Sequence, residues 1–521
     1  MKLRLAIFLA VLTVIRLAIC GANELSPDEA YYYMWSQRPD LSYYSKGPGV
    51  AMAILASTKL FGATEFGVRC FSPFLALGTS LIVFALAKRL YNEKTGLWAV
   101  LLIQCIPIFN AGSLVMTIDP LSIFFWSAGV LTFWLALEKS PKFSLWWIAT
   151  GFAVGLGALC KYTNLAAILS MIAVLFLVPA WRSEWKRPGI YIAIAIGLLC
   201  LTPPVVWNAQ HNWITFGHLS ERGGLDSGFA FHPLQPLEFL AAHLGVYSPL
   251  IFGMLIVSLF TGIRGIQTNR KTAFLIAFAV PLIALYFGLS FKEAGEANWT
   301  APAMVTLAIF GVHDWLRRCQ KSAWANKLVF AALALGALIS VALIISEPLR
   351  TIGVKWPYAW DPGARLRGWK ETGKVVDEVR KEVEAKTGAP VFLIANKYQV
   401  AASLAWYLPD KTPAELGHPP VYIPESQVIQ NQFSFWPSYD LFEEAPPSQL
   451  DPFNTEQQGV NKFVGRNALY VTDRAEGKPA SSLMRGFARW EYVGSRQISL
   501  HGMPLREIRF FVCYDYQTLP L

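Results

Sequence analysis

Long apolar runs recur along most of this chain, and they constrain its fold more than any other feature. A helix that crosses a bilayer needs about 20 mostly apolar residues, and about eleven runs approach that length. The expected spans lie near residues 3–22, 68–90, 95–112, 119–138, 145–160, 163–181, 189–206, 239–262, 272–290, 299–316 and 327–346. Only 15% of the 521 residues are charged, which is well below the proportion in soluble domains. The sequence therefore predicts a mainly α-helical, polytopic membrane bundle.

Basic residues in the short loops predict the orientation of the bundle. When the expected spans are threaded alternately, these residues gather on one side, which is cytoplasmic by the positive-inside rule. They are Lys2, Arg4, Lys88, Arg89, Lys94, Lys139, Lys142, Arg182, Lys186, Arg187, Arg264, Arg270, Lys271, Arg317, Arg318, Lys321 and Lys327. Orientation thus explains the net charge of +10, and nucleic acid is not an expected partner. The longer polar loops are expected on the extracytoplasmic face.

Two regions depart from the pattern of spans. The run 49–62 is short and contains Lys59, which predicts an interfacial helix in the first outer loop. From about residue 350 the composition becomes that of a soluble domain, with an amphipathic helix over 370–386. The strands expected there are 390–396, 467–472, 496–500 and 507–514. We expect a membrane domain over 1–349 and an extracytoplasmic α/β domain over 350–521.

The seven cysteines and seven histidines are scattered, with no CxxC pair and no Cys/His cluster. This distribution predicts neither a disulfide framework nor a zinc site. The first 21 residues have the basic start and apolar core of a signal peptide but no convincing cleavage site. We therefore expect them to form an uncleaved first helix.

Asp28 and Glu29 follow the first expected span. Adjacent carboxylates at a membrane surface are costly unless they are solvated, paired or used in chemistry. Helix initiation explains them without any chemistry, because Ser26 is a suitable N-cap, Pro27 suits the first helical position and Glu29 completes a capping box. On the local sequence alone, capping is the simpler explanation.

Lys46 and Asp119 are two further charged residues on the expected outer face. The positive-inside rule does not explain a lysine at position 46 on the outer face, and a lysine there can hold a phosphate. The alternative is a surface lysine that snorkels to the membrane interface. Asp119 enters an apolar helix, which makes it a functional candidate. The alternative is that Asp119 is an N-cap with Pro120 at the first helical position.

The other outer loops mix aromatic residues, which are common at membrane interfaces, with polar groups able to bind sugar hydroxyls or phosphate. The candidates are Tyr44, Lys161, Trp207, Asn208, His211, Asn212, Trp213, Arg222, Lys292, Glu293, Glu296, Asn298 and Trp299. Each is a weak signal by itself, so their order along the chain carries the argument.

Taken in order, these elements resemble the membrane glycosyltransferases of the C-type fold that use polyprenyl-phosphate sugars. The branch is the bacterial one that contains the aminoarabinose transferase of lipid A and its protein O-mannosyltransferase relatives. The segments that carry the resemblance are PDEAYYYMW (27–35), YYSKGPGVA (43–51), VRCFSPFLALG (68–78), TIDPLSIFFW (117–126), GLGALCKYT (155–163), PPVVWNAQHNWITF (203–216) and GEANWTAPA (295–303). The resemblance covers roughly the first 350 residues.

The resemblance implies roles for single residues. Asp28 corresponds to the essential first-loop aspartate, Asp119 to a second acidic residue near the fourth span, and Lys46 to the lysine that contacts the donor phosphate. The aminoarabinose branch has an acidic metal ligand just before that lysine, where this chain has Ser45. A divalent cation is therefore left open, and no other cofactor is expected.

Further residues are assigned by the chemistry of the donor. A polyprenyl phosphate leaves as an anion and needs cationic stabilisation, for which Lys161 and Arg222 are candidates. Asp28 acts as general base if the acceptor is a hydroxyl, and orients the substrates if the acceptor is a phosphate. The expected substrate contacts are Glu29, Tyr44, Asn208, His211, Asn298 and Trp299.

The sequence thus predicts a glycosyltransferase of the bacterial inner membrane whose active site is extracytoplasmic. It would move a sugar from undecaprenyl or another polyprenyl phosphate to lipid A, lipopolysaccharide or another envelope glycan or protein, by inverting direct displacement. A rival prediction is a transporter or flippase of lipid-linked sugars, which would need polar residues near mid-membrane on several spans. A polymerase or ligase acting on a diphosphate-linked glycan is a third.

Overall fold

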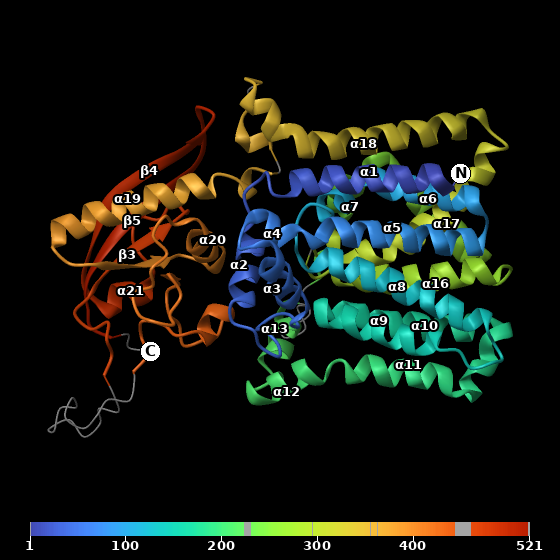
Figure 1. Cartoon of the computed structure of the whole chain (residues 1–521), viewed down its shortest axis with the longest axis horizontal. Helices are drawn as coiled ribbons and strands as arrows, with labels where there is room; N and C mark the ends of the chain where they lie inside the picture. Colours follow the sequence, from blue (N-terminus) through green and yellow to red (C-terminus); the bar gives the residue numbers. More distant parts are fainter. Residues whose placement is uncertain are drawn as a thin grey trace. The chain divides into compact units, whose positions relative to one another are not determined.

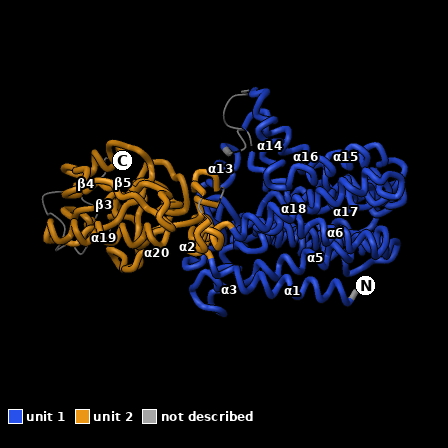
Figure 2. Tube along the Cα trace, turned by 90° about the horizontal axis from the view of Figure 1, so that it is seen from above, with its two compact units in different colours: residues 1–22, 35–345 blue, residues 23–34, 346–521 orange. Residues whose placement is uncertain are grey.

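The computed structural model describes residues 2–222, 231–293, 295–354, 356–361, 363–442 and 460–518. The chain divides into two compact units (Figure 2). The first contains residues 1–22 and 35–345, and the second contains residues 23–34 and 346–521. A short N-terminal segment therefore belongs to the same unit as the C-terminal part of the chain.

Helices build the first unit (Figure 1). In its first part these are α1 Lys2–Cys20, α3 Gly49–Phe61, α4 Glu65–Arg69, α5 Phe71–Leu90, α6 Glu93–Cys105, α7 Pro107–Gly112, α8 Ile118–Glu138 and α9 Trp146–Cys160. There follow the 3-10 turn η1 Tyr162–Leu165, α10 Ala166–Leu177, the 3-10 turn η2 Pro179–Lys186, α11 Pro188–Leu199, α12 Thr202–Gln210 and α13 Ile214–Arg222. The last are α14 Gln235–Tyr247, α15 Pro249–Gly265, α16 Arg270–Leu289, the 3-10 turn η3 Ala297–Thr300, α17 Ala301–Cys319 and α18 Ala323–Thr351.

The apolar helices confirm the expected membrane bundle. Among the described residues, five helices are long and apolar enough to cross a bilayer, and up to eight if each of three bent helix pairs counts as one span. Each of the eleven expected runs coincides with a helix or a broken pair of helices. The expected interfacial run 49–62 is the separate helix α3.

Three expected spans are bent helix pairs, and two of them bend sharply. The run 239–262 bends by 116° between α14 and α15, where Ser248 has a φ of 68° and Pro249 follows. The run 163–181 bends by 116° where Pro179 opens η2. Proline lacks the N–H that would continue a helix, so the helix breaks at these positions. Both runs stay apolar across the break, and apolar composition alone therefore does not reveal it.

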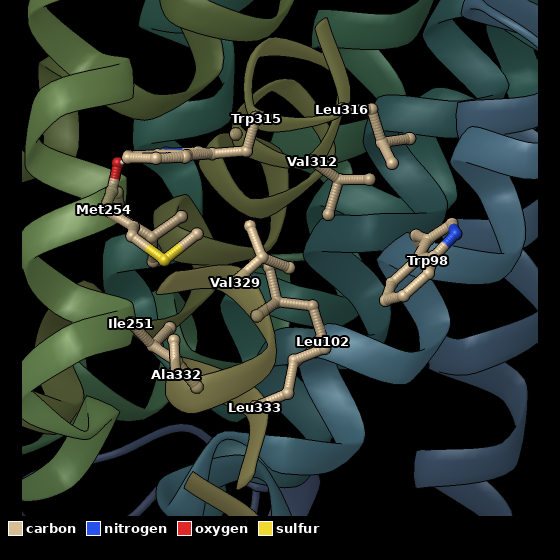
Figure 3. A pocket seen from close by; sticks show the side chains of 12 residues that line it. Trp98, Leu102, Ile251, Met254, Val312, Trp315, Leu316, Val329, Ala332 and Leu333 are labelled. Atoms are coloured by element: carbon tan, nitrogen blue, oxygen red, sulfur yellow. Dashed lines mark hydrogen bonds between the residues drawn. The ribbon is translucent and has the colours of Figure 1, made fainter. Parts of the chain in front are cut away.

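Aromatic residues fill much of the core of the first unit. Phe278 packs edge-to-face on Phe133 and Trp126, with ring centroids 5.9 Å and 6.1 Å away. A cavity of 40 Å³ among α6, α15, α17 and α18 is lined by apolar side chains, including Leu102 and Val312 (Figure 3). A small apolar cavity of this kind stays dry, so it reflects packing and not a binding site.

The second unit is built on a mixed five-stranded sheet of order β2-β1-β3-β5-β4. Its strands are β1 Val391–Ala395, β2 Val421–Tyr422, β3 Asn467–Thr472, β4 Phe487–Leu500 and β5 Met503–Tyr516, and its helices include α2 Pro27–Ser36, α19 Trp369–Thr387, α20 Tyr398–Tyr407 and α21 Ser481–Gly486. Strand β1 is parallel to β2 and β3, whereas β5 is antiparallel to β3 and β4. The expected α/β domain is therefore confirmed.

Local sequence explains two features of this sheet. The β4–β5 hairpin turns at His501 and Gly502, whose φ values are 52° and 72°, and two successive positive φ angles are the signature of a two-residue hairpin turn. Helix α19 starts and ends next to left-handed glycines, Gly368 and Gly388, because glycine adopts that conformation without strain. The sequence analysis missed β2, which has only two residues.

Candidate functional site

Asp119 lies at the start of α8, and two side chains from distant parts of the sequence hold its carboxylate. Lys161 donates to Oδ1 at 2.8 Å, and the Asn298 amide donates to Oδ2 at 2.6 Å. The Lys161 side chain is only 7% exposed. Low local dielectric strengthens such charge-assisted hydrogen bonds. The structure therefore brings together three of the predicted site residues.

The N-cap interpretation of Asp119 is wrong. The N-cap of α8 is Thr117, whose hydroxyl accepts from the backbone N–H of Asp119. Because Thr117 takes the capping role, the carboxylate of Asp119 is available for Lys161 and Asn298. Its contacts are tertiary and not local.

Lys161 follows the last residue of α9, where the helix gives way to η1. Next to it, the Asn164 amide donates to the backbone oxygen of Ser122 in α8 at 3.0 Å, and the Ser122 hydroxyl donates to Asn164 Oδ1 at 2.6 Å. These two bonds hold the end of α9 against α8. Sequence analysis missed this pair, because Asn164 and Ser122 are ordinary polar residues inside apolar runs.

The loop that contains Lys46 packs against the same end of α9. A Cβ atom at Gly47 would overlap the carbonyl oxygen of Leu159, so glycine is required for this close approach. The Ser42 hydroxyl lies 3.2 Å from the Lys46 carbonyl and 3.1 Å from the Tyr162 hydroxyl. The sequence element around Lys46 and the one around Lys161 are therefore neighbours in space.

Two tyrosines of this loop are buried. Tyr43 donates to the Trp35 carbonyl at 3.0 Å, and Tyr44 packs on His218 with ring centroids 4.6 Å apart. Burial raises the pKa of Tyr43 to about 12. Burial and the nearby charge of Glu221 also raise the pKa of Tyr44. Both phenols therefore stay protonated at neutral pH and keep their hydrogen-bond donors.

Asn208 and His211 serve the turn between α12 and α13. The Asn208 amide donates to the Pro204 carbonyl at 2.8 Å, and its Oδ1 accepts from the Thr215 N–H at 3.2 Å. The His211 ring stacks on Trp207, with centroids 4.0 Å apart. Trp207 in turn donates to the Asp40 carboxylate at 2.8 Å. These contacts order the turn, and substrate binding by Asn208 or His211 stays a prediction.

Asp28 and Glu29 lie in α2 of the second unit and differ in their surroundings. Ser26 N–H donates to Glu29 Oε2 at 2.9 Å, and Glu29 N–H donates to the Ser26 hydroxyl at 3.2 Å. This reciprocal pair is the capping box that the sequence predicts. Glu29 is fully buried, whereas Asp28 is exposed. The two carboxylates therefore have different roles in the helix.

The tyrosines after Asp28 anchor α2 within the second unit. The Tyr31 hydroxyl accepts from the Gln432 N–H at 2.7 Å, and its ring packs 4.5 Å from that of Tyr398. The Tyr33 ring meets Trp406 edge-on at 4.4 Å. A firm anchor of this kind fixes the helix from which Asp28 projects.

Trp299 and Arg222 are two further residues that the sequence predicts at the site. Trp299 packs on Tyr286 of α16, with ring centroids 5.1 Å apart. Arg222 is the last residue of α13, and its side chain lies outside the described residues. Binding of the donor phosphate by Arg222 stays a prediction.

The described part of the chain contains no cluster of three or more His, Cys, Asp or Glu side chains suited to a metal ion. Ser45 also stands where the resemblance expects an acidic ligand. The described residues therefore supply no such cluster for a dedicated metal site.

Known proteins share parts of this sequence. Residues 45–207 match the family described as dolichyl-phosphate-mannose-protein mannosyltransferase. The lipid A galacturonosyltransferase RgtD of Rhizobium johnstonii is 29% identical over 297 residues, which cover 57% of this chain and 61% of that protein. The undecaprenyl phosphate-α-4-amino-4-deoxy-L-arabinose arabinosyl transferase of Erwinia tasmaniensis is 24% identical over 320 residues, covering 59% and 56%. The chain thus spans less than two thirds of the length of these relatives.

Solved structures extend the likeness to the whole chain. ArnT from Cupriavidus metallidurans in the apo state matches with a TM-score of 0.61 at 13% identity, over 98% of both chains. The same protein bound to undecaprenyl phosphate also matches with a TM-score of 0.61, at 14% identity over 97% of both chains. At this identity the match concerns the fold. The chain therefore has the C-type fold of ArnT, and its resemblance to the membrane glycosyltransferases of that fold is confirmed.

Proposed function

We propose that this protein is a membrane glycosyltransferase that moves a sugar from a polyprenyl phosphate to an extracytoplasmic acceptor. The observation that carries the proposal is the partly buried Lys161–Asp119–Asn298 cluster, with the Lys46 loop packed beside it. One N–H of the Lys161 ammonium donates to Asp119, and a lysine has three. The remaining donors suit a phosphate oxygen that gains charge during transfer.

An apolar groove supports a lipid-borne donor. It has a volume of 560 Å³ and is lined by residues of α14, α15, α16 and α17, among them Phe239, Leu244, Phe260 and Phe287. His243 also lines it, and the His243 ring is hydrogen-bonded to Thr300 at 2.9 Å, two residues from Asn298. We assign the groove to the isoprenoid tail of the donor, which would place the donor phosphate near the cluster.

The proposed reaction is a direct displacement. A lone pair of the acceptor oxygen attacks the anomeric carbon, the bond from that carbon to the phosphate oxygen breaks, and the electron pair leaves with the phosphate. Lys46 and Lys161 stabilise the released polyprenyl phosphate. Asp28 accepts the proton when the acceptor is a hydroxyl. Attack from the face opposite the leaving group inverts the anomeric configuration.

The names of the relatives guide the choice of substrates. One is called a lipid A galacturonosyltransferase and another an undecaprenyl phosphate aminoarabinose transferase. We propose undecaprenyl phosphate as the carrier and lipid A as the first acceptor to test. The proposal includes the bacterial inner membrane as the location, with Asp28 and the cluster on the outer face.

Reconstitution in proteoliposomes tests this function. Purified protein, lipid A and undecaprenyl-phosphate sugars should yield glycosylated lipid A and free undecaprenyl phosphate, both measured by mass spectrometry. Asp28→Asn and Lys46→Ala should each reduce the yield strongly, and wild-type rates for both would refute the mechanism. Movement of the donor across the bilayer without sugar transfer would replace the proposal with a transporter.

A further inference from the structure

A buried network of hydrogen bonds lies beside the Asp119 cluster and is not used by the reaction as described. Its centre is Thr300, the last residue of η3. The Thr300 hydroxyl lies 2.9 Å from His243 Nε2 and 3.1 Å from the Tyr247 hydroxyl. All three side chains are at most 1% exposed. His243 and Tyr247 are four residues apart on α14, so they share one face of that helix.

The direction of these bonds follows from the donors available. His243 Nδ1 lies 2.7 Å from the Phe239 carbonyl, which can only accept, so Nδ1 carries the hydrogen in the neutral ring. Nε2 is then an acceptor for the Thr300 hydroxyl, and the Thr300 oxygen accepts from Tyr247. The Ala297 carbonyl lies 3.0 Å from the Thr300 hydroxyl and 3.4 Å from that of Tyr247. Each hydroxyl has one hydrogen, so in this arrangement the Ala297 carbonyl receives neither of them, and the network ties the Thr300 end of η3 to α14.

Asn298 lies in η3, two residues before Thr300. Its amide donates to Asp119 Oδ2 at 2.6 Å, while Lys161 occupies Oδ1. A shift of the turn would move the amide and change the position of the carboxylate. Because the Asp119–Lys161 pair is largely removed from solvent, loss of the Asn298 hydrogen bond should alter its geometry.

We propose that Thr300, held by His243 and Tyr247, is a positioning residue that sets η3 so that Asn298 orients the Asp119–Lys161 pair for sugar transfer. The inference rests on the proposed function and extends it to three residues outside the reacting groups. Thr300 touches no substrate and acts through Asn298.

Thr300→Val tests the role, because it removes the hydroxyl and keeps the side-chain shape. Misplacement of catalytic groups by about 1 Å can cost on the order of 100-fold in rate, so we expect kcat to fall roughly 10- to 100-fold while KM for undecaprenyl-phosphate sugar changes less than about 2-fold. Thr300→Ser restores the hydroxyl and should recover most of the rate. Wild-type kcat in Thr300→Val would overturn the proposal, as would failure of Thr300→Ser to recover.

Thr306→Val is the matched control. Thr306 is buried in the same segment of the chain, in α17, and among the described residues its hydroxyl donates to the Ala303 carbonyl one turn earlier. Loss of this hydroxyl should leave kcat unchanged. An equal loss of rate in both variants would show a general packing effect and overturn the specific role of Thr300.

A double-mutant cycle with Asn298→Ala tests the route of the effect. If Thr300 acts through Asn298, Thr300→Val should cause no further loss of kcat in the Asn298→Ala background. Losses that multiply would refute the route through Asn298.

Hydrogen exchange in the full-length protein separates this inference from the proposed function. Amides of residues 297–300 should exchange faster in Thr300→Val and at the wild-type rate in Thr300→Ser and Thr306→Val. If wild-type protein transfers no sugar, the proposed function fails, yet exchange still decides whether Thr300 holds the turn. Unchanged exchange in Thr300→Val would overturn the positioning role.

Discussion

Both units contain a buried cation, but the two cations are bound in different ways. Lys161 of the first unit has one carboxylate partner, Asp119, and is not stacked on any aromatic ring among the described residues. Arg350 of the second unit bonds Asp361 at 2.5 Å and Glu347 at 3.4 Å. Its guanidinium also lies 4.3 Å from the Trp356 ring centroid and 4.0 Å from that of Tyr358.

This difference separates a structural charge from a candidate catalytic one. Two aromatic rings and two carboxylates enclose Arg350 and offset its charge, but its Nε and Nη2 are buried without a hydrogen-bond partner among the described residues. Lys161 keeps donors for a further anion, next to a loop that carries a second lysine. Burial of a charge and donors without a partner are therefore weak evidence of function. The surroundings are better evidence: a loop with a second lysine lies beside Lys161, whereas aromatic rings enclose Arg350.

Removal of the Arg350 charge should have the largest effect, and that effect should be on stability. Arg350→Met leaves Asp361 and Glu347 with Arg367 as their remaining arginine partner, and loss of one member of a buried ion pair costs up to about 3–5 kcal/mol. Hydrogen exchange of β1 and β3 amides in the full chain should show that loss for the second unit. The kcat of the folded fraction should stay at wild type; a specific loss of kcat would mean that Arg350 also acts in catalysis.

Removal of the Lys161 charge should affect the rate instead. Lys161→Met should lower kcat by about 100- to 1000-fold, because a preorganised cation stabilises the departing phosphate. Sugar transfer in proteoliposomes measures it. The double variant Lys161→Met/Asp119→Asn removes both charges and avoids an unpaired buried carboxylate. If the double variant regained wild-type kcat, the role of Lys161 would be structural, like that of Arg350.

Glu425 is a buried titratable group of the second unit, and its ionisation should change the free energy of unfolding but not kcat. Burial and the charge of Asp440 raise its pKa to about 8. The folded state therefore favours the protonated form, and its stabilisation is present at pH below about 4.5 and lost as pH rises towards 8. Thermal unfolding should show a loss of about 3 kcal/mol between pH 5 and 7.5. Glu425→Gln should flatten this profile, whereas Glu491→Gln, at an exposed site, should not.

Occupation of the apolar groove should have the smallest effect and should act on donor binding. Gly253 lines the groove, and a Cβ there would meet no atom within 4 Å. The side chain in Gly253→Leu would enter the groove and should raise KM for the donor roughly 10-fold, or about 1.4 kcal/mol, with little change in kcat. Gly245→Leu, also in open space but not part of the groove lining, is the control. Equal KM values for both variants would contradict the assignment of the groove to the isoprenoid tail.

Periodic and local features were predictable from the sequence. Apolar runs predicted the helices, valines at helical spacing predicted α19, and the Ser26–Glu29 spacing predicted a capping box that the structure contains. The sharp bends at Ser248 and Val178 were not predicted, because hydropathy reports the composition of a segment and not the direction of its helix axis. Asn298 was a weak candidate in a mixed loop, Thr300 lay in the segment GEANWTAPA without being singled out, and His243 and Tyr247 gave no signal.

The sequence by itself determined that this chain is a helical membrane protein with a soluble α/β domain, since burial of apolar surface depends on residue type and spacing. It also determined which charged residues stood apart from the orientation pattern. Only the tertiary structure decided that Asp119 meets Lys161 and Asn298, which are 42 and 179 positions away in the chain. Contacts over such separations arise from helix packing, which local residue patterns do not encode.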